Sequence, residues 1–139
     1  MKTKKSLHSE EFGKLIEQFA EACHKAGKLN LVVIGEDMRI VACSGVPKNE
    51  IANYKISSGT NELIDLHRLY VWASDKAKIP VTENQQYFVS VIAPVFSERD
   101  IIGAVAVIDT PNLVEPSDSQ IKCAQTAAVF FGNYLANAN

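Results

Sequence analysis

Residues 86–109 read QYFVSVIAPVFSERDIIGAVAVID, and this stretch decides the fold. It holds two long apolar runs separated by the polar turn Ser97-Glu98-Arg99-Asp100. Runs rich in Val, Ile and Phe around a short polar turn predict two buried strands joined as a hairpin. The rest of the chain carries no recognisable catalytic motif. The function therefore has to be inferred from the fold and from the residues that could form a pocket beside this sheet.

Length and charge favour one domain that does not bind nucleic acid directly. The chain has 139 residues, a net charge of −2, 47% apolar residues and 22% charged residues, all ordinary for one globular domain. Its one basic cluster, Lys2, Lys4 and Lys5, reads as solvated charge. We therefore expect a flexible tail over residues 1–8, a single domain over 9–139, and no direct nucleic-acid partner.

Targeting and metal signals are missing from the sequence. No apolar run reaches the roughly 18 residues that a membrane span needs, and the polar segment Ser6–Lys14 follows the basic N-terminus, so a cytoplasmic protein without a membrane partner is expected. The three cysteines are widely spaced, odd in number and without a CxxC pair. The three histidines show no ligand spacing, so neither metal nor cofactor is predicted.

Both ends of the chain predict amphipathic helices. Apolar residues recur at three- and four-residue spacing from Ser9, a candidate cap, to Ala26. A second helix is expected over Asp118–Ala136, where Ser117 and Gln120 form a capping box. This last helix is apolar on two sides, so one side covers the sheet and the other needs the N-terminal helix or a second copy. The predicted dimer interface comprises Phe12, Phe19, Cys123, Ala127, Phe130 and Tyr134.

The middle of the chain predicts further strands and short helices. They are strands Leu29–Ile34 and Met38–Cys43, a short helix over 49–54, a Thr60-capped helix over 61–67, strand Leu69–Trp72 and a surface connector over 74–85. Strands and helices do not alternate regularly, which argues against a doubly wound fold. The expected class is α+β, a central antiparallel sheet of about five to six strands with the terminal helices packed on one face.

Three segments carry a resemblance to a known family. They are VVIGEDMRIVACSGVPKNEI over 32–51, VIAPVFSERDIIGAVAVI over 91–108 and AQTAAVFFGNYL over 124–135. Together they resemble GAF domains, and more narrowly the C-terminal GAF-type domain of the sporulation transcription regulator stage V sporulation protein T. The resemblance extends from about Phe12 to Leu135.

The resemblance implies a sensing role and limits the ligand. The regulator it points to binds DNA through an N-terminal swapped hairpin, and no such segment precedes the first expected helix here. The Asn-Lys-x-Phe-Asp-Glu motif of cyclic-nucleotide-binding GAF domains is also missing, so a cyclic nucleotide is a poor ligand guess. In GAF-like folds the ligand lies between the sheet and the middle segment, here Val46–Trp72. The candidate pocket residues are Cys43, Tyr54, His67, Arg68, Tyr70 and Trp72.

Each candidate has an ordinary structural alternative. Arg68 would pair with a ligand carboxylate or phosphate, or it is simply a solvated cation. Tyr70 and Trp72 would form aromatic walls, or they belong to the core. Cys43 is the one candidate redox nucleophile, in the manner of GAF relatives that reduce free methionine sulfoxide, but no resolving cysteine lies close in sequence, and a buried free cysteine is often only a small hydrophobic residue.

The expected function is a non-enzymatic regulatory domain, linked to transcription or sporulation-type regulation. It would bind an unknown small-molecule effector and form a homodimer through its terminal helices. Two alternatives stay open: a small cysteine-dependent enzyme of the free methionine sulfoxide reductase type, and a dimerisation domain without a ligand.

Overall fold

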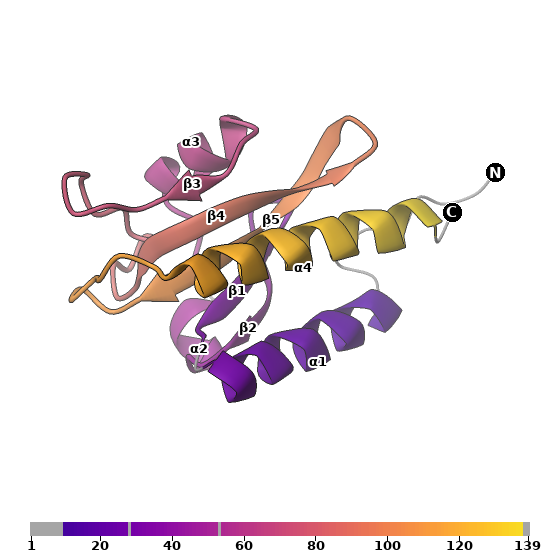
Figure 1. Cartoon of the computed structure of the whole chain (residues 1–139), viewed down its shortest axis with the longest axis horizontal. Coiled ribbons are helices and arrows are strands. Elements are labelled where there is room, and N and C mark those ends of the chain that lie inside the picture. Colours follow the sequence, from indigo (N-terminus) through magenta and orange to yellow (C-terminus); the bar gives the residue numbers. More distant parts are fainter. Residues whose placement is uncertain (1–9, 28, 53, 138–139) are drawn as a thin grey trace.

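The computed structural model describes residues 10–27, 29–52 and 54–137 (Figure 1). The expected tail and the Ser9 cap lie outside the described residues. The elements, in chain order, are α1 (Glu10–Gly27), β1 (Leu31–Gly35), β2 (Ile40–Ser44), α2 (Lys48–Ile51), α3 (Ser58–Asp65), β3 (Tyr70–Val71), β4 (Phe88–Ser97), β5 (Asp100–Asp109) and α4 (Asp118–Asn137).

The five strands form one sheet in the order β2-β1-β5-β4-β3, and every pairing is antiparallel. The long hairpin predicted from residues 86–109 is confirmed as β4 and β5, which pair from Phe88↔Asp109 to Ser97↔Asp100. β5 also pairs with β1, so it has a neighbour on both sides and is buried along most of its length. This explains why its sequence is an almost continuous apolar run.

One face of the sheet is covered by the two terminal helices, as predicted (Figure 1). Ile16 and Ala20 of α1 and Ala124 and Phe131 of α4 are buried there against alternate residues of the strands. We call this layer the α1/α4 core. α4 approaches β4 so closely that a Cβ atom on Gly132 would lie 2.2 Å from the main-chain oxygen of Phe96. Glycine therefore allows this helix to lie against the strand.

The other face is covered by α2, α3 and the connector that leads into β4. Its buried residues come from all of these elements and from the opposite side of the strands; they are Val32, Ile34, Ile40, Ile51, Ile56, Leu63, Ile64, Val81, Val89, Ile92, Ala104, Ala106 and Ile108. We call this layer the α2/α3 core. The short helices contribute few residues each, so the layer depends on long-range packing more than on helix propensity.

The two predicted helix caps have different outcomes. The capping box of α4 is confirmed, because Gln120 N donates to Ser117 Oγ and Ser117 N donates to Gln120 Oε1. The Thr60 cap is wrong: α3 begins at Ser58, and Ser57, in an extended conformation, accepts the Thr60 N–H at 3.0 Å. A side-chain acceptor in extended conformation is what an N-cap requires.

The connector over 74–85 is only partly at the surface. Residues 74–78 are exposed, but Val81 and Thr82 are 0% and 1% exposed. Isolated bridges join Thr82 to Ile56 and Pro80 to Phe88. The second half of the connector is drawn inward because it completes the α2/α3 core, a long-range role that its polar composition does not reveal.

Candidate functional site

The α2/α3 core has an apolar floor and a polar rim. Ile92 and Ala106 of the sheet are buried beneath Ile51 of α2 and Ile64 of α3. At the end nearest α2, the rim consists of Glu50, Asn84, Tyr87 and Cys43. Apolar side chains bordered by a few converging polar groups are the usual chemistry of a small-molecule site.

Glu50 and Tyr87 fasten α2 to the connector. The Tyr87 hydroxyl donates to Glu50 Oε2 at 2.7 Å, and Asn84 Nδ2 donates to the Glu50 carbonyl at 3.0 Å. The hydrogen bond to Glu50 is the main reason that the pKa of Tyr87 lies above its ordinary value, with burial and the Glu50 charge adding to it. The phenol therefore stays protonated and keeps donating at neutral pH.

Cys43 lies beside this pair at the end of β2. Its side chain is half-buried against the α2/α3 core, and its Sγ lies 3.8 Å from the Val46 carbonyl. Burial raises the pKa of the Cys43 thiol; the nearby Lys48 ammonium opposes that shift, and Glu17 adds to it. Lys48 itself is paired with Glu17, Nζ to Oε1, at 3.6 Å. A thiol whose pKa is raised is a poor nucleophile near neutrality.

The opposite end of the layer is held by hydroxyl groups. Ser57 Oγ and Thr60 Oγ1 both lie within hydrogen-bond distance of the Pro80 carbonyl, at 2.5 Å and 2.8 Å. Both hydroxyl-bearing residues are buried. These bonds fix α3 to the connector, so the α2 end and the α3 end of the layer are each clamped by a separate polar cluster.

The six predicted pocket residues are distributed between the α2/α3 core and the surface. Tyr54 is 45% exposed, and His67 and Arg68 are exposed after α3. The His67 ring instead meets Phe96 edge-on, at 6.5 Å between ring centroids. Of the six, Cys43 and Tyr70 pack against the α2/α3 core.

The sequence left open that Tyr70 and Trp72 belong to the core. In the structure Tyr70 is partly buried and Trp72 is buried. Burial raises the pKa of Tyr70, and Lys76 Nζ lies 4.9 Å from the centre of its ring. Trp72 is 6% exposed, and its indole N–H has no hydrogen-bond partner within the described residues. Both side chains therefore contribute to packing, and their predicted contact with a ligand stays a prediction.

The rim residues Glu50, Asn84 and Tyr87 were missed by sequence reasoning. Glu50 and Tyr87 are separated by 37 positions in the chain, and no local pattern relates residues that far apart. The only available signal was that Tyr87 opens an otherwise apolar strand with a polar group.

The predicted dimer residues divide into two groups. Ala127 is fully buried in the α1/α4 core, and Cys123 packs against it. Phe130 and Tyr134 are 43% and 37% exposed, and Phe130 stacks on Phe19 of α1 at 6.1 Å between ring centroids. The side chain of Phe12 lies outside the described residues. The exposed aromatic surface thus consists of Phe130 and Tyr134, bordered by Phe19.

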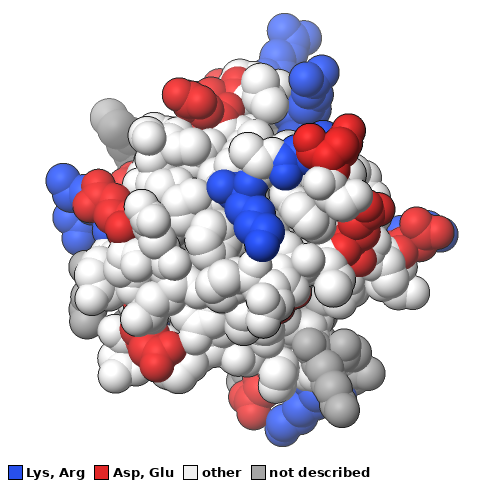
Figure 2. Space-filling model, turned by 90° about the vertical axis from the view of Figure 1, so that its left-hand side faces the viewer, with Lys and Arg blue, Asp and Glu red and all other residues white. Residues whose placement is uncertain are grey.

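Surface charge and metal-type clusters give no second site. Figure 2 shows basic and acidic side chains interspersed on the face it presents, without a field of one sign. Across the part of the chain that the structure describes, no group of three or more His, Cys, Asp and Glu side chains is arranged to hold a metal ion. Among the described helices, none combines the length and the apolarity that crossing a membrane requires.

Comparison with solved structures identifies the fold. The chain resembles the cofactor-binding GAF domain of the nutrient sensor CodY from Clostridium difficile, with 11% identity, a TM-score of 0.60, and 86% of this chain and 83% of that chain covered. It also resembles the GAF domain/HD domain protein from Geobacter sulfurreducens, with 13% identity, a TM-score of 0.59 and coverage of 98% and 96%. Identities this low establish a shared GAF fold alone.

A further neighbour is the GAF domain of the Acinetobacter phosphoenolpyruvate-protein phosphotransferase, with 12% identity, a TM-score of 0.57 and coverage of 98% and 85%. No curated protein sequence matches the chain. The model of the family described as "Stage V sporulation protein T C-terminal, transcription factor" matches residues 11–136. The chain therefore belongs to the family of stage V sporulation protein T C-terminal domains.

Proposed function

We propose that this domain is a non-enzymatic sensor that binds a small effector in the α2/α3 layer and dimerises through its terminal helices. The observation that carries the proposal is the Glu50–Tyr87 hydrogen bond at the rim of an apolar layer. One solved neighbour is described as the cofactor-binding GAF domain of a nutrient sensor, and effector binding is the part of that description we extend to this chain.

The layer favours an effector that is mostly apolar and carries one polar group. The floor consists of aliphatic side chains, while Glu50 Oε2 and the Tyr87 hydroxyl form the nearest polar pair. An effector with a hydrogen-bond donor would compete with Tyr87 for the Glu50 carboxylate. Because α2 has only four residues and the Glu50–Tyr87 and Asn84–Glu50 bonds tie it to the connector, breaking them would let it move.

Such movement would reach the terminal helices through β2. Cys43 packs on the α2/α3 core, while Lys48, at the start of α2, pairs with Glu17 of α1. A ligand shifts an equilibrium only by binding one arrangement more tightly than the other. We propose that the arrangement of α2 is the one it selects, and that the Lys48–Glu17 contact carries part of the change to α1.

Dimerisation would use the aromatic surface of α4. Phe130 and Tyr134 are large, exposed and adjacent, with 6.4 Å between ring centroids. Aromatic residues clustered on an exposed helix face are typical of interface centres. In this scheme, effector binding alters how two cytoplasmic copies pack and thereby regulates transcription, in line with the transcription-factor family.

The raised thiol pKa gives no support to a redox enzyme. Cys43 and Cys123 form no disulfide and pack on opposite layers of the sheet, so neither is placed to resolve a disulfide with the other. The sensor is the reading we favour, and the experiment below separates it from the ligand-free dimerisation domain.

Native mass spectrometry of the protein isolated from its own host cells tests effector binding. We expect a non-covalent small molecule that is released on denaturation. We expect the Glu50→Gln variant, isolated in the same way, to retain less of it. Repeated isolation of the bare chain, with host metabolites failing to alter its melting temperature, would support the ligand-free dimerisation domain instead.

A further inference from the structure

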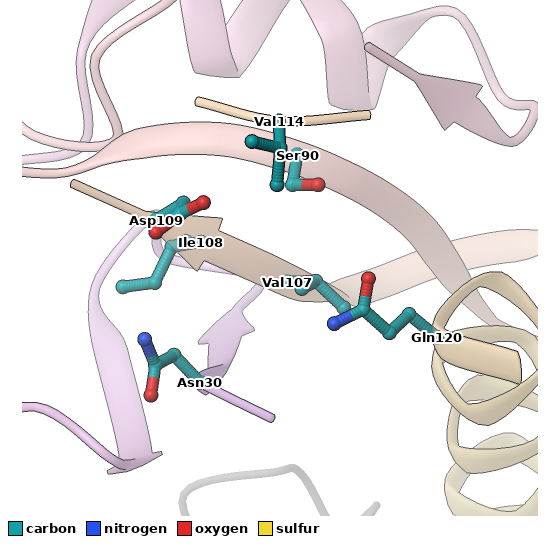
Figure 3. Close-up of a pocket in the computed structure, with 7 residues that line it drawn as sticks. All are labelled: Asn30, Ser90, Val107, Ile108, Asp109, Val114 and Gln120. Atoms are coloured by element: carbon teal, nitrogen blue, oxygen red, sulfur yellow. The ribbon is translucent and has the colours of Figure 1, made fainter. Parts of the chain in front are cut away.

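A cavity lies away from the Glu50–Tyr87 rim, close to the start of α4. Its volume is about 170 Å³, and it lies where β1, β4 and β5 meet the connector into α4 (Figure 3). It is lined by Asn30, Ser90, Val107, Ile108, Asp109, Val114 and Gln120. A cavity of about 150 Å³ accommodates benzene, so this one has room for a compact molecule of similar size.

Ser90 is the buried polar group of this cavity. The residue is 4% exposed and is the most buried of the polar residues in the lining. A serine hydroxyl can both donate and accept a hydrogen bond.

A β-bulge places Ser90 in the cavity. In the β4–β5 register Val89 pairs with Ile108 and Val91 pairs with Val107, so Ser90 is the extra residue between them. Bulges redirect one side chain out of the regular alternation and are frequent beside binding sites. The Ser90 carbonyl also accepts the backbone N–H of Trp72 at 2.8 Å, which anchors this point of β4 to β3.

The other polar groups of the cavity are a carboxylate and two amides. Asp109 is the one charged residue among the described residues of the lining, and one of its oxygens accepts the Thr110 N–H at 2.8 Å. The Gln120 oxygen is already used by Ser117 N, so its NH₂ group remains available. Figure 3 shows the nitrogen of Gln120 directed toward Val107 and the nitrogen of Asn30 directed toward Asp109.

Charge near the cavity is otherwise accounted for. Lys78 Nζ donates to the Pro111 carbonyl at 2.6 Å, and Glu115 accepts the Ser74 N–H at 3.1 Å. Among the described residues, no basic side chain belongs to the lining. Within that part of the chain the carboxylate of Asp109 faces no cation in the cavity, while Ser90, Asn30 and Gln120 offer hydrogen bonds to a ligand oxygen.

We propose that this cavity binds a small protonated amine that carries a neighbouring hydroxyl or carbonyl oxygen. The ammonium group would lie against Asp109, because charge-assisted hydrogen bonds are the strongest available there. The ligand oxygen would accept from the Asn30 and Gln120 NH₂ groups, and the Ser90 hydroxyl would offer a further hydrogen bond. Gln120 belongs to the first turn of α4, so the ligand would tie that turn to the sheet.

Amide NMR with ethanolamine tests the site, because ethanolamine has both groups and ethylene glycol is its uncharged counterpart. Titrated at neutral pH and constant ionic strength, ethanolamine should shift the side-chain NH₂ signals of Asn30 and Gln120 saturably, with a dissociation constant in the millimolar range or tighter. Ethylene glycol should bind at least tenfold more weakly. Asp109→Asn should weaken ethanolamine binding at least tenfold, and Ser90→Ala should weaken it severalfold.

Asp100→Asn is the matched control, because Asp100 is an exposed carboxylate at the other end of the same strand. It should leave the dissociation constant unchanged. The proposal is overturned if no signal of the cavity saturates, if ethylene glycol binds as tightly as ethanolamine, or if Asp109→Asn folds normally and binds ethanolamine as the parent does.

Discussion

The hydroxyl of Tyr87 donates to Glu50 Oε2 across 2.7 Å, joining the start of β4 to the four-residue helix α2. This one bond links two segments that the chain order keeps far apart. It also sits at the rim of the layer where we propose that an effector enters. The stability of this region and the proposed effector binding therefore depend on the same two residues, Glu50 and Tyr87.

Tyr87→Phe should lower the free energy of unfolding by about 1–2 kcal/mol, because a hydrogen bond to a carboxylate is lost while the ring remains. Glu50→Gln should cost less, since its amide oxygen still accepts. Urea unfolding of both variants and of the double variant measures the pair. If the two single changes add without coupling, the bond contributes nothing to stability.

High pH should weaken the contribution of the Tyr87–Glu50 hydrogen bond to stability. The pKa of Tyr87 is raised in the folded protein, so the protonated phenol is favoured by folding. Its contribution is fully present below the pKa of an unfolded tyrosine, about 10, and is lost as pH rises through the folded value. Unfolding experiments from pH 8 upward should show a loss of stability that is smaller in Tyr87→Phe. An identical pH dependence in both proteins would contradict this.

Gly132→Ala should destabilise the protein although alanine favours helices. The new Cβ would lie 2.2 Å from the Phe96 carbonyl oxygen, so α4 must shift from the sheet. We expect a net loss of about 1–3 kcal/mol. Gly13→Ala in α1 is the control, because nothing lies within 4 Å of its added Cβ. That variant should gain up to about 1 kcal/mol. Equal effects in thermal unfolding would refute the close approach of α4.

Cys43 should react slowly with thiol reagents. Burial raises the pKa of its thiol, so less thiolate is present at pH 8 than in an unfolded chain. Mass-resolved alkylation with iodoacetamide should modify Cys43 more slowly in native protein than in urea. Fast native labelling, together with methionine sulfoxide reduction that disappears in Cys43→Ser, would favour the redox enzyme over the sensor.

Charge placed on the α4 aromatic surface should give a monomer. Phe130→Glu and Tyr134→Glu each place a carboxylate among exposed rings, and two such charges would meet in a symmetric dimer. Tyr54→Glu is the control, because Tyr54 is equally exposed but outside that surface. Sedimentation velocity should report a dimer for the parent and for Tyr54→Glu. A parent protein that sediments as a monomer would contradict the proposed dimer.

The elements were largely readable from the sequence because their signals are local. Apolar runs around Ser97–Asp100 predicted the hairpin, and Ser117 with Gln120 predicted the start of α4. The Thr60 cap failed because Ser57, Ser58 and Thr60 are all acceptable capping residues, and the path of the chain selects Ser57.

The site was not readable, because its contacts are long-range. The spacing of Glu50 and Tyr87 contains no period, and the burial of Val81 depends on which segments meet across the sheet. His67 and Arg68 were predicted because they belong to the middle segment to which the resemblance assigns the ligand, and the structure places both at the surface after α3. Ser90 sits in an apolar run, and only the register of β4 against β5 reveals the bulge that turns it into a cavity.

The central claim, effector binding in the α2/α3 layer, is tested most directly by methyl NMR. Fractionated metabolite extract of the host would be added to protein labelled at isoleucine and valine methyl groups. The account predicts that an active fraction shifts Ile51, Ile56, Ile64 and Val89, all in the α2/α3 core, and that Glu50→Gln reduces the effect. Shifts confined to Val91 and Val105 of the α1/α4 core, or no shifts with any fraction, would contradict it.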